Sequence, residues 1–280
     1  MSNVTLFLYL TALGVFQKPD FQKQSVLAVL DHDDLLEASG LDASLQNKEH
    51  FWSHNDSGGD PAVYLIDRKG KVKLKVLLEG IKNRDWEELV SVQHDDGAYL
   101  YIAEIGDNRG RYRDVSLLRI REPLLKADNQ FVIPSEEIEQ MTFTYEDGPR
   151  DAEAIFYDYA TEEFVLITKR EEEAMVYTFR FESGGSKEIL SRGKVPDRNF
   201  TAADCNQKGE ILVKTYDKIY FWNASSLSAA ERILDWEPQL LTYKPEPQGE
   251  AICWLDGDIY TISEKVRGFE QELLLFERTE

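Results

Sequence analysis

Five short acidic motifs recur along this chain, and their spacing limits the fold more than any other feature. They are Glu37–Leu41, Asp85–Leu89, Asp151–Ile155, Ala202–Cys205 and Gln248–Ile252. When the motifs are aligned on their acids, Glu37, Glu87, Glu153, Asp204 and Glu250, the gaps are 50, 66, 51 and 46 residues. A period of this size is typical of repeat architectures, in which each repeat is one supersecondary unit.

Each motif is followed by short runs rich in aromatic and β-branched residues, which predict strands. In the first repeat the expected strands are Glu37–Ser44, His50–Asn55, Ala62–Asp67 and Val72–Leu78. The second repeat gives Glu87–Gln93, Ala98–Ile105, Val115–Arg121 and Met141–Tyr145, and the third gives Glu153–Tyr159, Glu163–Thr168, Met175–Phe181 and Glu188–Val195. The fourth gives Thr201–Cys205, Ile211–Tyr216, Lys218–Trp222 and Gln239–Tyr243, with a short helix over Ser226–Leu234. The pattern predicts an all-β propeller built from four-stranded blades.

The fifth repeat is one strand short, because it offers only Ala251–Leu255, Ile259–Ser263 and Glu272–Glu277 before the chain ends. Ser25–Leu30 is an apolar run that can supply the missing strand and close the ring, which leaves no long open edge. We therefore expect five blades within a single domain of residues 25–280. A sixth blade in the long second gap is the alternative, although the insertion there contains Pro123 and Pro134.

Residues 1–24 are expected to form a leader. Val4–Phe16 is apolar but too short to span a bilayer, and no basic residue precedes Lys18. A degenerate export signal, which would place the protein in the periplasm or outside the cell, is slightly favoured. An extra strand or disordered leader on a cytoplasmic protein is the alternative.

The charge balance limits the partners. The chain has 52 acidic and 32 basic residues and a formal net charge of −20. Nucleic-acid binding requires basic groups that neutralise phosphates, so the balance argues against it and against anionic membranes. We expect a monomer that binds a small anionic ligand or a protein partner. The two cysteines, Cys205 and Cys253, form no C-x-x-C pair and are expected to be buried, reduced thiols.

Propeller topology predicts where the polar groups gather. The motif acids begin the innermost strands, and the ends of the second strands return to the same face. We therefore expect one acidic mouth, with the basic residues Lys169, Arg170 and Lys214 beside the acids. Two carboxylates about 6 Å apart repel by roughly 3 kcal/mol at an effective dielectric constant of about 20, so the ring needs compensation.

A hard divalent cation, most simply calcium, is one way to compensate the ring. The candidate ligands are Glu37, Asp56, Glu87, Asp107, Glu153 and Glu250. The alternative is that backbone amides and basic side chains satisfy the acids. His54 stands beside Ser53 and Asp56, but adjacent strand residues point to opposite faces, so this is no catalytic triad by spacing. His54 is either a structural or channel-lining residue, or a group that contacts substrate.

Several of these stretches resemble one family, the largely uncharacterised bacterial β-propeller proteins with short acidic blade motifs. The matching stretches are Trp52–Gly59, Asp85–Glu88, Ile105–Asn108, Asp151–Ala154 and Glu246–Ala251. The resemblance covers Leu30 to Glu264 and implies a propeller, often exported, with no established reaction. It is distantly similar to phytase-like and lactonase-like propellers, which hold calcium in or over the channel. Glu88 stands where the family usually has Asp, and Ala203 precedes Asp204 in place of the usual Gly.

Two hypotheses of function follow from the sequence. The first is a metal-dependent hydrolase of a small phosphate or carboxyl ester at the channel mouth. Its catalytic residues would be Glu87, Glu153, Asp204 and Glu250, and its substrate-binding residues Lys169, Arg170, Lys214 and His54. The second is a non-catalytic binding propeller in which the acidic ring is structural, because this fold hosts both kinds of function.

Overall fold

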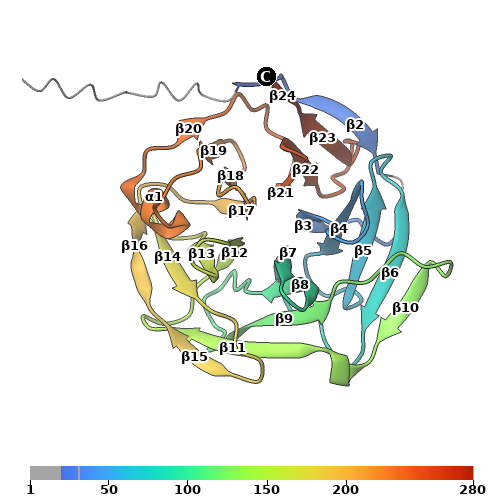
Figure 1. The fold of residues 1–280 in the computed structure, drawn as a ribbon, viewed down its shortest axis with the longest axis horizontal. Coiled ribbons are helices and arrows are strands. Elements are labelled where there is room, and N and C mark those ends of the chain that lie inside the picture. Colours follow the sequence, from blue (N-terminus) through green and yellow to red (C-terminus); the bar gives the residue numbers. More distant parts are fainter. Residues whose placement is uncertain (1–19, 31, 280) are drawn as a thin grey trace, which may run out of the picture.

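The computed structural model describes residues 20–30 and 32–279, and these residues form a ring of five mainly antiparallel sheets around a central axis (Figure 1). The first blade contains β3 (Ala38–Ala43), β4 (His50–Asn55), β5 (Ala62–Asp67) and β6 (Val72–Leu78). The second contains β7 (Trp86–His94), β8 (Gly97–Glu104), β9 (Val115–Arg121) and β11 (Glu139–Tyr145). The third contains β12 (Ala152–Asp158), β13 (Glu163–Thr168), β14 (Ala174–Phe179) and β16 (Ser191–Val195). The expected all-β propeller with five blades is confirmed.

The last two blades complete the ring. The fourth contains β17 (Phe200–Cys205), β18 (Ile211–Thr215), β19 (Ile219–Trp222) and β20 (Gln239–Leu240). The fifth contains β21 (Gly249–Leu255), β22 (Asp258–Ser263), β23 (Glu272–Phe276) and β2 (Ser25–Val29). β2 pairs antiparallel with β23, so a strand from the N-terminal segment closes the blade, as predicted.

Some strands lie outside this four-stranded plan. β10 (Gln130–Ile133) comes from the insertion in the second repeat and pairs parallel with β6 of the first blade. β15 (Ser186–Ile189) pairs parallel with β11 of the second blade, so the run expected at Glu188–Val195 divides between two blades. The long second gap therefore supplies an added edge strand rather than a sixth blade. β1 (Asp20–Phe21) and β24 (Arg278–Thr279) form a separate two-stranded sheet.

The one α-helix of the described chain, α1 (Ala229–Asp235), lies close to the predicted position, and a single 3-10 turn covers Ser135–Glu137. Ser228 and Glu231 form a reciprocal capping box that satisfies amide groups at its start. Among the described residues, no helix has the length and apolar character needed to cross a membrane. The apolar run Val4–Phe16 lies outside the described residues.

The core consists of apolar layers between neighbouring blades. Phe143 of β11 packs on Phe179 of β14 with ring centroids 4.7 Å apart, which joins the second and third blades. Phe51 of β4 packs on Tyr260 of β22 at 4.8 Å, which joins the first and fifth. Aromatic pairs of this kind contribute about 0.5–1.5 kcal/mol beyond their buried area. Trp86 is fully buried in the layer between the first two blades, and both cysteines are buried and unpaired.

Candidate functional site

The register of the inner strands shows which residues are equivalent at the start of each blade. The first paired residues of these strands are Ala38, Trp86, Ala152, Phe200 and Gly249. The next positions along the chain are Ser39, Glu87, Glu153, Thr201 and Glu250. Three carboxylates and two hydroxyl groups therefore share the position, and the predicted ring of five equivalent acids is wrong.

The two misaligned acids lie elsewhere. Glu37 is two residues before Ser39 and is exposed at the rim of the acidic mouth. Asp204 is three residues after Thr201 and lines a cavity formed with the turns at the far ends of the inner strands. In place of acids, Ser39 donates a hydrogen bond to the carbonyl of Glu87 at 2.9 Å, and Thr201 donates one to the carbonyl of Gly249 at 3.4 Å. These hydroxyl groups link neighbouring blades.

The acidic mouth contains two overlapping groups of carboxylates. Within each group one oxygen per residue lies within 4.8 Å of the others, and the groups are Asp56, Asp85 and Glu87, and Glu87, Asp151 and Glu153. Glu87 belongs to both. Asp85 and Asp151 were absent from the predicted site, although each stands two residues before a motif glutamate. Because alternate residues of a strand face the same side, the D-x-E spacing was a signal for them.

Gly106 is the residue that leaves room for this cluster. A methyl group on Gly106 would lie 2.6 Å from Cγ of Asp85 and closer still to Oε1 of Glu87. Real side-chain carbons do not approach other atoms this closely. The glycine of the Ile105–Asn108 stretch is therefore required for the observed packing of the acids.

Lys169 is the main basic group of the mouth. Its buried ammonium donates to Oε1 of Glu153, lies 3.8 Å from Oε1 of Glu250 and donates to the hydroxyl of Tyr216 at 2.9 Å. The Tyr216 hydroxyl donates to Glu250. Tyr216 follows the second strand of the fourth blade at the position that Lys169 occupies in the third, and it was not among the predicted site residues. The protein's own groups thus compensate two of the motif glutamates, Glu153 and Glu250.

A second basic residue, Arg170, pairs with Asp151 at 2.5 Å through its Nε and also donates to the side chain of Asn108. The second oxygen of Asp151 accepts the amide of Asp107 at 2.8 Å. One carboxylate oxygen of Asp107 accepts the amide of Tyr112 at 2.6 Å, which closes the loop over residues 107–112. These contacts hold the second and third blades together at the mouth.

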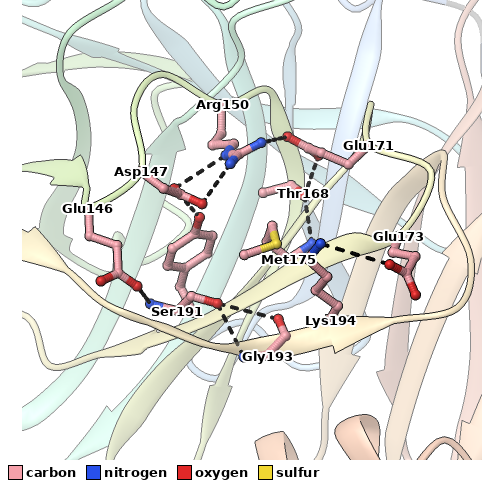
Figure 2. Close-up of polar contacts among 11 residues, drawn as sticks. Glu146, Asp147, Arg150, Thr168, Glu171, Glu173, Met175, Ser191, Gly193 and Lys194 are labelled. Carbon is pink, nitrogen blue, oxygen red and sulfur yellow. Dashed lines mark hydrogen bonds and ion pairs between the residues drawn. The ribbon is translucent and has the colours of Figure 1, made fainter.

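Figure 2 shows a polar network among Asp147, Arg150, Thr168 and Glu171. Arg150 and Thr168 are the chain neighbours of Asp151 and Lys169. Arg150, next to Asp151, bonds Asp147 at 2.6 Å and Glu171 at 2.7 Å. Glu171 accepts the Thr168 hydroxyl at 2.6 Å. The loop before β12 is therefore tied to the loop after β13, which fixes the third blade at the mouth.

Burial and mutual repulsion change the proton affinity of this cluster. Desolvation, followed by the charge of Glu153, raises the pKa of Glu87 well above its ordinary value. Desolvation, followed by the charge of Asp85, raises the pKa of Asp56 to about 7. Desolvation and Glu250 together raise the pKa of Glu264 to about 8. The pKa of Lys169 is raised by its carboxylate neighbours despite burial, so this ammonium stays charged.

The donor set fits a hard cation. Oε2 of Glu153 and Oδ1 of Asp56 are buried and have no hydrogen-bond partner within the described chain. Buried unpartnered carboxylate oxygens are costly unless a further group satisfies them. Oxygen-only ligands are those that calcium and magnesium prefer. Glu250 lies outside both carboxylate groups and is bound by Tyr216 instead.

Two predicted substrate-binding residues are fully buried between the blades. His54 has no exposed surface, its Nδ1 lies 3.0 Å from the carbonyl of Asn55, and burial lowers its pKa to about 4. Lys214 also has no exposed surface, and its ammonium donates to the carbonyl of Gly249 and lies 3.9 Å from Glu246. Neither side chain reaches a ligand at the mouth, so the expectation that they contact substrate is corrected.

A small cavity opens beside the carboxylate cluster. Its volume is about 320 Å³, and it is lined by Asp85, Asp107, Asn108, Arg109, Arg111 and Tyr112. The two arginines are exposed and were not part of the predicted site. Guanidinium groups bind carboxylate and phosphate oxygens in a bidentate manner, so this cavity offers anion-binding groups next to the acids.

No protein-family model and no curated protein matches the chain. Among solved structures it is similar to the glutaminyl cyclase of Myxococcus xanthus, with 11% identity, 92% of this chain and 97% of that chain covered, and a TM-score of 0.46. It is also similar to a luciferin-regenerating enzyme, with 11% identity, coverage of 89% and 79%, and a TM-score of 0.43. A chain of a nidogen/laminin complex matches at 6% identity, coverage of 84% and 74%, and a TM-score of 0.47. Likenesses this low transfer no activity, and the propeller assignment rests on the strand pairing itself.

Proposed function

We propose that the acidic mouth binds a divalent cation, with calcium the expected ion, and that the protein hydrolyses a small anionic phosphate or carboxyl ester there. The observation that carries the proposal is the pair of overlapping carboxylate groups that share Glu87, with unpartnered buried oxygens on Glu153 and Asp56. The ion would be held by Asp56, Asp85, Glu87, Asp151 and Glu153. When bound, such an ion lowers the pKa of a coordinated water and so supplies a nucleophile near neutral pH.

The remaining groups have separate roles in this proposal. Lys169 orients Glu153 and stays charged, which limits the repulsion within the ring. Arg170, Arg109 and Arg111 would bind the anionic group of the substrate beside the carboxylates. Glu250, which lies outside the ion-binding set, is the candidate for moving protons at the mouth. Asp204 is omitted from the catalytic set, because it lines the cavity at the far ends of the inner strands.

The alternative is a non-catalytic binding propeller whose acidic ring is structural. The ion pairs from Lys169 and Arg170 favour it, because they give Glu153 and Asp151 basic partners without any added ion. Neither ion pair gives Glu87 a basic partner in the described chain. Substitution of Glu87 therefore distinguishes the two hypotheses.

Thermal unfolding with added calcium, magnesium and manganese chloride tests the cation site. We expect millimolar calcium to raise the Tm of the wild type and not that of Glu87→Gln. Glu37→Gln is the matched control, because Glu37 is an exposed acid at the same rim, and it should keep most of the shift. A Tm that none of the three salts raises above that of the protein without added salt would overturn the cation site. Turnover of p-nitrophenyl phosphate and p-nitrophenyl acetate then separates the hydrolase from the binding propeller.

A further inference from the structure

A second cavity, of about 780 Å³, lies at the opposite mouth of the channel, and every blade contributes to its wall. Asp42, Ser91, Tyr157, Asp204 and Trp254 come from the first to the fifth blade in turn. The turn between β3 and β4 and the turn between β17 and β18 form its rim. Its size falls within the range of about 300–1,000 Å³ that is usual for small-molecule sites.

The charged side chains that line this cavity are predominantly acidic. They are Asp42, Glu49, Asp204, Asp256, Lys48 and Lys208. Asp42 accepts the amides of Ser91 at 2.5 Å and Ala43 at 2.7 Å, and Asp204 accepts the amide of Trp254 at 2.7 Å. Within the described chain these two carboxylates are thus held in place by backbone amides rather than neutralised by basic side chains. They are preorganised acceptors that lack a counter-charge.

A further polar group in the cavity wall lacks a partner. Ser91 is 95% buried, and its hydroxyl has no hydrogen-bond partner within the described chain. A buried hydroxyl usually bonds protein or water, so an unpartnered one in a cavity wall indicates a ligand or water position. The hydroxyl belongs to the residue whose amide donates to Asp42. A group that can both donate and accept a hydrogen bond therefore lies beside this carboxylate.

Aromatic rings provide the complementary part of the wall. Tyr157 and Tyr159 line the cavity and pack edge to face with centroids 5.1 Å apart. The Tyr159 hydroxyl donates to the carbonyl of Ser91 at 3.3 Å, which fixes this ring against the second blade. Aromatic faces attract ammonium groups placed within about 6 Å of the ring centre.

We propose that this cavity binds a small organic amine, whose ammonium group is taken by Asp42 and Asp204 and whose carbon chain packs on Tyr157 and Tyr159. A bound metal ion fits less well, because the close triplets of ligand atoms in the described residues occur at the other mouth. An anion is disfavoured by the excess of carboxylates. The site is separate from the proposed ester-hydrolysing mouth and does not depend on that function.

Isothermal titration calorimetry of the full chain with n-butylammonium and 1,4-diaminobutane tests the proposal, with 1-butanol and butyrate as neutral and anionic analogues of similar size. We expect saturable 1:1 binding of the amines, at least tenfold tighter than that of 1-butanol. Butyrate should not displace the bound amine. Equal affinity for the alcohol, or displacement of the amine by butyrate, would overturn the proposal.

Variants locate the bound amine. Asp204→Asn keeps an acceptor for the Trp254 amide and should weaken amine binding at least tenfold, and Tyr159→Leu should weaken it several-fold. Lys208→Ala, at the rim, and Glu87→Gln, at the other mouth, should leave the Kd within twofold. Circular dichroism confirms that each variant is folded. Unchanged affinity in folded Asp204→Asn, or a loss in Glu87→Gln instead, would place the amine elsewhere and reject this site.

Discussion

Lys169 and Glu153 form a buried ion pair that joins the start of β12 to the end of β13, and each side chain is at most 4% exposed. The pair sits at the mouth of the channel rather than on the surface, and Lys169 also contacts Tyr216 of the fourth blade and Glu250 of the fifth. Lys169 therefore links three blades and supplies the fixed positive charge of the candidate site.

Removing one partner of this pair is expected to be costly, because an uncompensated charge would remain buried. We expect Lys169→Met to lower the free energy of unfolding by about 3–5 kcal/mol. Urea denaturation measures this change. The double variant Lys169→Met/Glu153→Gln should recover only part of the loss, since Glu153 then carries no charge but Glu250 still lacks its ammonium neighbour.

A surface pair provides the control for this measurement. Lys265 and Glu270 lie 3.5 Å apart, with side chains 40% and 67% exposed. Lys265→Met should change stability by less than about 1 kcal/mol. Similar losses from both lysine variants would contradict the role given to the buried pair.

Gly106→Ala is expected to disturb the carboxylate cluster directly, because the added methyl group meets Asp85 and Glu87. Overpacking of this kind costs about 1–3 kcal/mol. The calcium-induced rise in Tm should also shrink in this variant. Thermal unfolding with and without calcium measures both effects.

Gly59→Ala is the matched control, because a methyl group on Gly59 meets no atom within 4 Å and its φ is not positive. It should change stability by no more than about 0.5 kcal/mol. A Gly106→Ala protein as stable and as calcium-responsive as Gly59→Ala would show that the cluster does not need the space.

The fold could be predicted from the sequence because the strand and turn patterns that specify it are local and recur in each repeat. Each blade carries its own strands and turns, and the apolar run at Ser25–Val29 could be matched to the strand missing from the fifth blade. The parallel additions of β10 and β15 were not predicted, because parallel pairing joins segments from different repeats and leaves no short-range pattern.

The site was predicted only in part, for a reason that lies in the register. At the position shared by Glu87, Glu153 and Glu250, the first and fourth blades carry Ser39 and Thr201, which bond neighbouring backbone carbonyls. Alignment on the nearest acid therefore selected Glu37, which is two residues before Ser39, and Asp204, which is three residues after Thr201. Strand pairing, rather than residue type, decides the alignment.

His54 gives a prediction for acidic pH. Burial lowers its pKa to about 4, from about 6.5 in the unfolded chain, so the unfolded state binds the proton first. Stability is therefore lost as the pH falls from about 6.5 to 4, by about 3 kcal/mol from this group. His54→Gln has no imidazole to protonate and so lacks this loss. The difference in free energy of unfolding between the wild type and the variant should therefore shrink as the pH falls. Urea denaturation at pH 7.5 and pH 4 measures the difference, and an advantage independent of pH would contradict a neutral buried imidazole.

Asp204 gives the opposite pH dependence. Desolvation raises its folded-state pKa to about 6, above the ordinary 3.8, so the folded protein binds the proton more tightly than the unfolded chain. Stability then falls as the pH rises from about 3.8 to 6, by at most about 3 kcal/mol, and stays level above pH 6. Asp204→Asn removes this penalty and keeps an acceptor for the Trp254 amide.

We therefore expect Asp204→Asn to be more stable than the wild type at pH 7.5, with the difference vanishing near pH 4. The charge of Asp204 also contributes to raising the pKa values of four groups on other strands and loops. These groups are Asp42, Glu88, Tyr159 and Cys253. Because the Asp42 and Asp204 carboxylates repel each other, the stability gained from Asp204→Asn should be smaller in an Asp42→Asn background. Urea denaturation of the four proteins in this cycle at both pH values measures the coupling. Equal gains in both backgrounds would show that the two carboxylates do not interact across the channel.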